Sequence, residues 1–100
     1  MLDQVTYETM KDVVGSTFHI NTGDRNIDFV LVWAGKVMES EMARLKRTPF
    51  SLHFLGPGDP FLPQRMYGVR HPAFGEDEVP VFIVPISKEA EGFKYEAVFT

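Results

Sequence analysis

The feature that most constrains this chain is a two-residue alternation of apolar and polar side chains, which recurs in short segments. Successive side chains of a β-strand point to opposite faces of a sheet, so this alternation is typical of half-buried strands. Clusters of glycine, proline, asparagine and aspartate, which favour turns, separate the segments. The predicted strands cover residues 17–21, 27–33, 50–54, 66–71, 79–86 and 93–99.

Six short strands with short connections predict a mainly β fold, a small six-stranded barrel or sandwich with one or two short helices. Residues 27–33 are apolar on both predicted faces, with Ile27, Phe29, Leu31 and Trp33 on one and Val30, Val32 and Ala34 on the other. Such a strand is covered on both sides or curled into a barrel. Closure also removes exposed edges, so we favour the barrel. A chain of 100 residues is expected to form a single domain, residues 1–100.

Two segments carry helical spacing. Residues 6–14 predict at most two turns ending at Gly15, and Thr6 followed by Thr9 gives no capping box. Met38, Met42 and Leu45 are spaced like one face of a helix, which indicates core packing or a partner-binding surface.

Prolines mark two candidate docking surfaces. Pro80 and Pro85 place the strand 79–86 at a sheet edge, or put bulges at its ends, because proline lacks the N–H of a ladder. The loop 56–63 contains three prolines and two glycines, and we expect Phe61 and Leu62 to pin it to the body of the protein. Loops held in this way often carry binding function.

Composition excludes several functions. The net charge of −4 argues against a nucleic-acid partner, which calls for a basic face. No apolar stretch approaches the roughly 20 residues that cross a bilayer, so we expect no membrane association. The first residues lack signal-peptide features, which predicts a cytoplasmic location. The absence of cysteine excludes disulfides, a thiol nucleophile and thiolate metal sites.

The three histidines give little support for catalysis. His19 and His53 fall on polar faces of their strands, and only adjacent strands would let them join Asp28 or Glu96 in a metal site. Their spacing matches no metal motif, so we predict no metal and no cofactor. His71 precedes a proline at a strand end, where its ring is expected to pin the turn; it is a weak candidate for a catalytic residue.

The second half of the chain also resembles a known family through a set of short matches. They are Pro49-Phe50-Ser51-Leu52, Phe54, Gly56-Pro57, Pro63-Gln64, Tyr67, His71-Pro72, Gly75, Phe82-Ile83-Val84-Pro85-Ile86 and Tyr95-Glu96-Ala97-Val98-Phe99. Residues 49–100 are thereby similar to an uncharacterised family of small bacterial domains of unknown function, encoded near phage-tail-collar-type proteins. The resemblance implies an accessory role in a phage-tail-like assembly, and it supplies no catalytic residue.

These observations favour a structural or protein-interaction module that docks another protein, with a homo-oligomer also allowed. The predicted docking residues are Asp59, Phe61 and Leu62 in the loop 56–63, together with the strand 79–86. The alternative is a small-ligand binder whose barrel mouth is lined by Trp33, Tyr67 and Tyr95. A hydrolase or metal-dependent enzyme using His71 is the least favoured reading.

Overall fold

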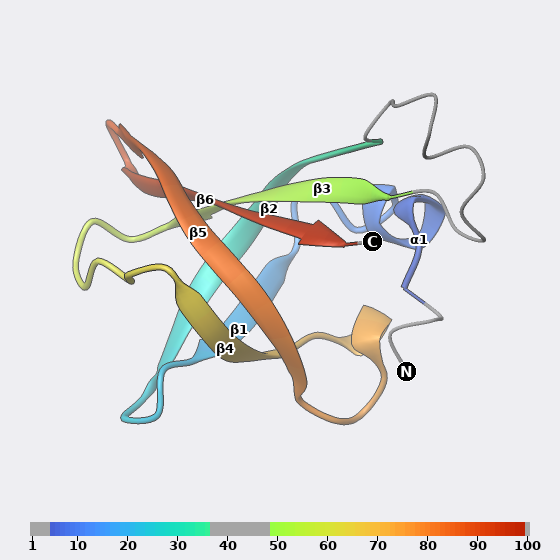
Figure 1. Ribbon diagram of the computed structural model, residues 1–100, viewed down its shortest axis with the longest axis horizontal. Helices are drawn as coiled ribbons and strands as arrows, with labels where there is room; N and C mark the ends of the chain where they lie inside the picture. The colour runs from blue at the N-terminus through green and yellow to red at the C-terminus, as the bar shows by residue number, and fades with distance from the viewer. Residues whose placement is uncertain (1–4, 37–48, 100) are drawn as a thin grey trace.

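Six antiparallel strands form a closed barrel in the computed structural model, which describes residues 5–36 and 49–99 (Figure 1). The order around the barrel is β1-β2-β3-β6-β5-β4, and β4 pairs back onto β1. The elements are α1 (Tyr7–Lys11), β1 (Thr17–Asn21), β2 (Asn26–Lys36), β3 (Phe50–Gly56), β4 (Arg65–Arg70), a 3₁₀ turn η3 (Pro72–Phe74), β5 (Val79–Glu89) and β6 (Gly92–Phe99). The predicted mainly β, six-stranded barrel is confirmed.

Alternation along each strand fills the interior with apolar side chains. The buried core residues are Val5, Met10, Phe18, Ile20, Ile27, Phe29, Leu31, Phe50, Leu52, Phe54, Leu62, Tyr67, Val69, Phe74, Val79, Val81, Ile83, Tyr95, Ala97 and Phe99. Aromatic rings meet across the interior, with 4.6 Å between the centroids of Phe29 and Tyr95 and 5.2 Å between those of Phe18 and Phe54. Side chains therefore pack the barrel, as expected for a barrel of this size.

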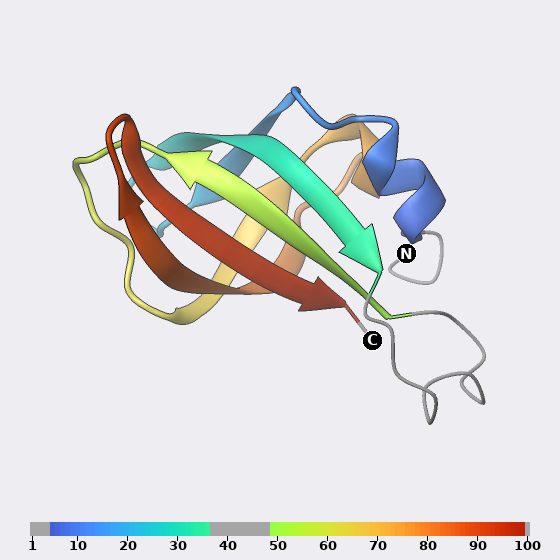
Figure 2. The same ribbon diagram turned by 90° about the horizontal axis from the view of Figure 1, so that it is seen from above.

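The two ends of the barrel differ (Figures 1 and 2). The helix α1 and the turn η3 lie at one end, whereas the β1–β2, β3–β4 and β5–β6 connections gather at the other, hereafter the loop end. The helix buries Met10 and has a capping box, which the sequence interpretation had missed. Thr9 takes the place of the usual glutamate because its hydroxyl accepts from the backbone N–H of Thr6 while the Thr6 hydroxyl accepts from that of Thr9. Val14 lies beyond the end of this helix and is exposed.

A β-bulge in β2 changes the predicted faces of this strand. Ile27, Phe29 and Leu31 point inward as predicted, but the register with β3 shifts between Leu31 and Trp33. A bulge adds one residue to a strand and so reverses the alternation beyond it. Trp33 consequently lies on the outer face, with 47% of its surface exposed.

The strand β5 is not an edge strand, so the first of the two predictions made from its prolines is wrong. Residues 79–83 pair with β4 and residues 84–89 pair with β6, so the strand bridges two neighbours. The other reading is confirmed at one end, where the register with β6 shifts between Pro85 and Ser87. The strand continues to Glu89. The closure between β1 and β4 has only three residue pairs: His19 with Arg70, Ile20 with Val69 and Asn21 with Gly68.

The predicted face formed by Met38, Met42 and Leu45 lies outside the described residues. Within the ranges 5–36 and 49–99, no helix is long and apolar enough to cross a lipid bilayer.

Candidate functional site

The loop between β3 and β4 is pinned to the barrel, but its two predicted anchors differ. Leu62 is buried, and its backbone N–H donates to the Tyr95 hydroxyl at 3.0 Å. Phe61 is about half exposed and meets the Phe93 ring edge-on, with 4.9 Å between ring centroids. Leu62 is therefore a core residue unavailable to a partner, whereas Phe61 presents apolar surface beside the loop.

The three aromatic residues predicted to line a ligand-binding mouth are not brought together. Tyr67 and Tyr95 are both buried, and burial raises the pKa of each hydroxyl. The Tyr67 hydroxyl donates to the carbonyl of Pro63 at 2.6 Å, so both tyrosines hold the loop. Trp33 lies on the outer face instead, where its ring is 4.5 Å from that of His53 and covers Gly35.

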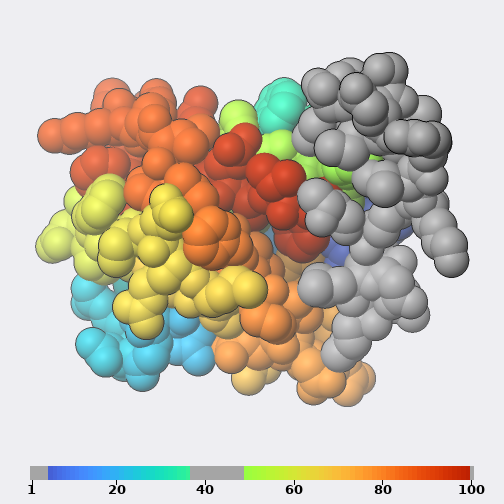
Figure 3. Space-filling model, viewed as in Figure 1, coloured from blue at the N-terminus to red at the C-terminus, as the bar shows by residue number. Residues whose placement is uncertain are grey.

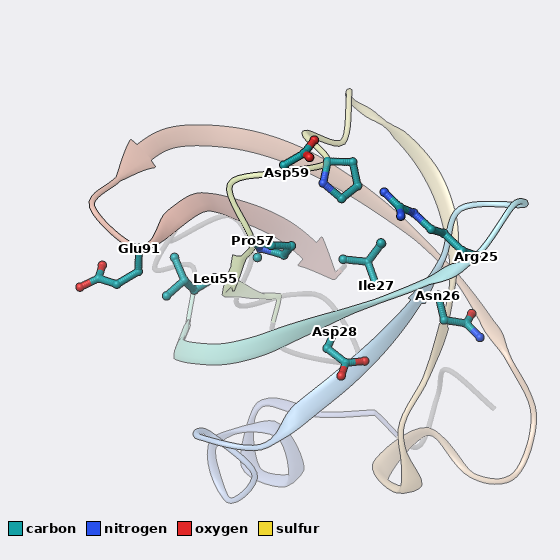
Figure 4. A pocket seen from close by; sticks show the side chains of 10 residues that line it. Arg25, Asn26, Ile27, Asp28, Leu55, Pro57, Asp59 and Glu91 are labelled. Carbon is teal, nitrogen blue, oxygen red and sulfur yellow. The ribbon is translucent and has the colours of Figure 1, made fainter.

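A cavity of about 510 Å³ does lie at the loop end, with a different lining (Figure 4). It is formed by residues of the β1–β2 hairpin, the β3–β4 loop and the β5–β6 turn: Arg25, Asn26, Ile27, Asp28, Leu55, Gly56, Pro57, Asp59, Pro60 and Glu91. Of the residues predicted to bind, Asp59 alone contributes to this cavity. Figure 4 shows Arg25 reaching over the cavity toward the loop that carries Asp59, while Glu91 points away.

His71 pins the turn after β4, as the sequence suggested. Its Nδ1 accepts from the backbone N–H of Ala73 at 3.0 Å, so the ring proton resides on Nε2. Nε2 lies 2.9 Å from the Ser16 hydroxyl, which donates onward to the Val13 carbonyl at 2.6 Å. The ring also stacks on Phe18. Burial and the neighbouring His19 lower the pKa of His71, and both of its ring nitrogens are engaged within the protein.

His19 and His53 do not meet, because β2 lies between their strands. Each pairs instead with a carboxylate that the sequence had named: His19 Nδ1 is 2.9 Å from Asp28 Oδ1, and His53 Nε2 is 3.2 Å from Glu96 Oε2. The Ser51 hydroxyl donates to the same oxygen of Glu96 at 2.8 Å. Among the described residues, no group of three or more histidine and acidic side chains is placed to hold a metal ion.

An apolar surface on the outside of the barrel was not predicted. Met66 of β4 and Phe82 of β5 are directly opposed across the two strands, and 59% and 46% of their surfaces are exposed. Val84 follows Phe82 on the same face of β5 and is half-buried. We call these three residues the apolar face. Figure 3 shows β4, β5 and β6, in yellow, orange and red, on the side of the molecule that is turned to the viewer.

The sequence held a signal for this surface. Val79, Val81 and Ile83 occupy the inward positions of β5, and Phe82 stands in the outward phase where a polar residue is expected. If both faces of β5 were covered, Phe82 would be buried. The barrel has a single layer of strands, so Phe82 on its outer face is exposed to solvent.

A family model for a domain of unknown function, DUF6916, matches residues 5–99. The chain belongs to the DUF6916 family. No curated protein and no solved structure matches it. The matched residues include β1 and β2 as well as the second half of the chain.

Proposed function

We propose that this DUF6916 domain is a protein-interaction module that docks a partner protein on the apolar face. The opposed pair Met66 and Phe82 carries the proposal, because both side chains are large, apolar and exposed on adjacent strands. Contiguous exposed apolar surface is costly in water and marks interaction sites. Phenylalanine and methionine are also enriched at the centres of protein interfaces.

The scaffold supports this role because the apolar face is rigid. Tyr67, next to Met66 in β4, is buried, as are Val81 and Ile83 on either side of Phe82. The outer side chains are therefore held on a backbone anchored by the packed interior, and binding would order little further structure. Phe61 is a second exposed apolar side chain, from the predicted docking loop. The more specific proposal of a partner in a phage-tail-like assembly rests on the family resemblance alone.

The test uses Phe82→Glu as the disrupting variant and Val32→Glu as its control. Val32 is an exposed apolar residue of another strand, with 40% of its surface accessible. Wild type and both variants serve as bait for affinity purification with crosslinking, and thermal unfolding checks each fold. We expect the crosslinked partner to map to β4 and β5, to be lost with Phe82→Glu and to be kept with Val32→Glu.

Sedimentation of the purified chain identifies one particular partner. A wild-type dimer that becomes a monomer with Phe82→Glu would show that the partner is a second copy. A partner that Phe82→Glu retains at wild-type affinity would refute docking on the apolar face.

The cavity at the loop end favours a second candidate function, binding of a small molecule. Its volume of about 510 Å³ lies in the range of ligand pockets, and Ile27, Leu55 and Pro57 give it apolar walls beside Asp59. Methyl NMR spectra distinguish the two functions. Small-molecule binding would shift the resonances of Ile27 and Leu55, whereas protein docking would shift those of Met66 and Val84.

A further inference from the structure

A row of polar side chains crosses the outer surface of the barrel at its shortest ladder, the one between β1 and β4. His19 of β1 is paired with Asp28 of β2 on one side and with Arg70 of β4 on the other. All three point outward and are exposed. The row therefore places a base, an acid and a guanidinium on three adjacent strands.

Asp28 fixes the imidazole of His19. The carboxylate can only accept, so the 2.9 Å contact between His19 Nδ1 and Asp28 Oδ1 puts a proton on Nδ1. Nε2 is thereby left as the nitrogen that faces a bound molecule. A carboxylate behind a histidine orients the ring.

An open cavity of about 450 Å³ lies beside this row. It is lined by His19, Arg70, His71, Pro72, Gly75 and Glu76. His71 and Pro72 form a rigid wall, because the hydrogen bonds from Ala73 and to Ser16 lock the His71 ring. This wall offers apolar surface to the body of a ligand, whereas His19 and Arg70 offer polar groups to one end of it.

Arg70 retains capacity for an anion. Its ion pair with Glu78 is long, with 3.9 Å between Nε and Oε2, and 59% of the arginine side chain is exposed. Glu78 is engaged elsewhere, since its Oε2 accepts from the Asn21 side-chain amide at 2.9 Å. A guanidinium held so loosely can turn its paired N–H groups to a carboxylate, the geometry that arginine binds best.

We propose that this cavity binds a small organic monocarboxylate. The Arg70 guanidinium pairs with the ligand carboxylate, the His19 ring lies beside it, and the apolar body of the ligand lies against Pro72 and His71. Glu76 on the rim and Glu78 behind Arg70 add negative charge, which disfavours a dianion such as phosphate. The site is separate from the apolar face, so it does not depend on the proposed docking function.

Titration with benzoate, followed by NMR of the histidine rings and backbone amides, tests this assignment, and inorganic phosphate is the second probe. We expect benzoate to shift the resonances of His19, Gly75 and Glu76 with a dissociation constant on the order of 1 mM. Arg70→Gln is expected to weaken binding about tenfold or more, while Arg65→Gln, at an exposed arginine where β4 begins, is expected to leave it unchanged.

Unchanged spectra at saturating benzoate, or equal affinity in wild type and Arg70→Gln, would overturn the site. Phosphate binding more tightly than benzoate would overturn the monocarboxylate assignment.

Discussion

The substitution Tyr95→Phe isolates the hydrogen bond that holds the β3–β4 loop against the barrel. The phenyl ring can keep the stacking of Tyr95 on Phe29, while the backbone N–H of Leu62 loses its 3.0 Å acceptor. Leu62 is only 4% exposed, so water cannot replace that acceptor without opening the loop. An orphaned buried donor costs about 1–3 kcal/mol, and removing the buried hydroxyl offsets part of this cost. We expect a loss of about 1–2 kcal/mol in the free energy of unfolding.

Two other tyrosines provide the comparison. Tyr67→Phe removes a donor from the Pro63 carbonyl, but Pro63 is exposed and its carbonyl can accept from water, so we expect a loss of about 0.5 kcal/mol. Tyr7→Phe serves as the control, because the Tyr7 hydroxyl makes no hydrogen bond with any other residue that the structure describes.

Urea unfolding followed by circular dichroism measures all three variants. For a domain of this size, a loss of about 1–2 kcal/mol corresponds to a fall in Tm of about 4–16 °C. Tyr95→Phe as stable as Tyr7→Phe would refute the role of this bond. Tyr67→Phe more destabilised than Tyr95→Phe would refute the reasoning about the orphaned donor.

Two further predictions concern the barrel itself. The pKa of His71 is lowered in the folded chain, so the unfolded chain takes up the proton first as the pH falls below the ordinary value of 6.5. Stability should thus be full above about pH 6.5 and decrease as the pH falls through the lowered pKa, and urea titrations should show this loss in wild type but a smaller one in His71→Gln. Gly92 has a φ of +153° and its added Cβ would collide with the Gly56 backbone, whereas Gly58 has open space. Gly92→Ala should cost about 2–5 kcal/mol and Gly58→Ala less than about 0.5 kcal/mol, which thermal unfolding compares directly; equal costs would contradict this account.

Alternation predicted the interior of the barrel well where strands are regular. In β3, the alternating residues Phe50, Leu52 and Phe54 are buried, and in β4 so are Tyr67 and Val69. The reason is physical: each strand has one face that must leave water, and a period of two identifies it without knowledge of the neighbouring strands.

The sequence predictions were wrong where strand pairing or local backbone geometry determines which way a side chain points. The face of Trp33 depends on the bulge in β2, and no residue type in the segment 27–33 marks that bulge. Proline in β5 was compatible with an edge or with a bulge, and only the pairing with β4 and then β6 selects between them. The capping box at Thr9 was not predicted because the usual sequence pattern has glutamate or glutamine at this position, whereas here a threonine hydroxyl accepts the hydrogen bond.

The candidate sites were harder to predict than the fold. Pairing of His19 with Asp28 and Arg70 requires the strand order, since these residues come from β1, β2 and β4. The apolar face requires the knowledge that β5 is covered on its inner side only. Leu62 was predicted to anchor the loop, and it does, but its burial removes it from any contact with a partner.

Because the ladder between β1 and β4 is short, we expect the barrel to open first at this joint between the two strands. Ile20 and Val69 occupy its middle, and a carboxylate braces it from outside: Glu78 receives the Asn21 amide and lies over Gly68, whose missing side chain makes room for it. Amide protons at this joint should exchange with solvent sooner than those between β3 and β6, which share seven pairs. A ligand that contacts both His19 and Arg70 would link β1 to β4, so its binding should slow the opening motions of the whole sheet.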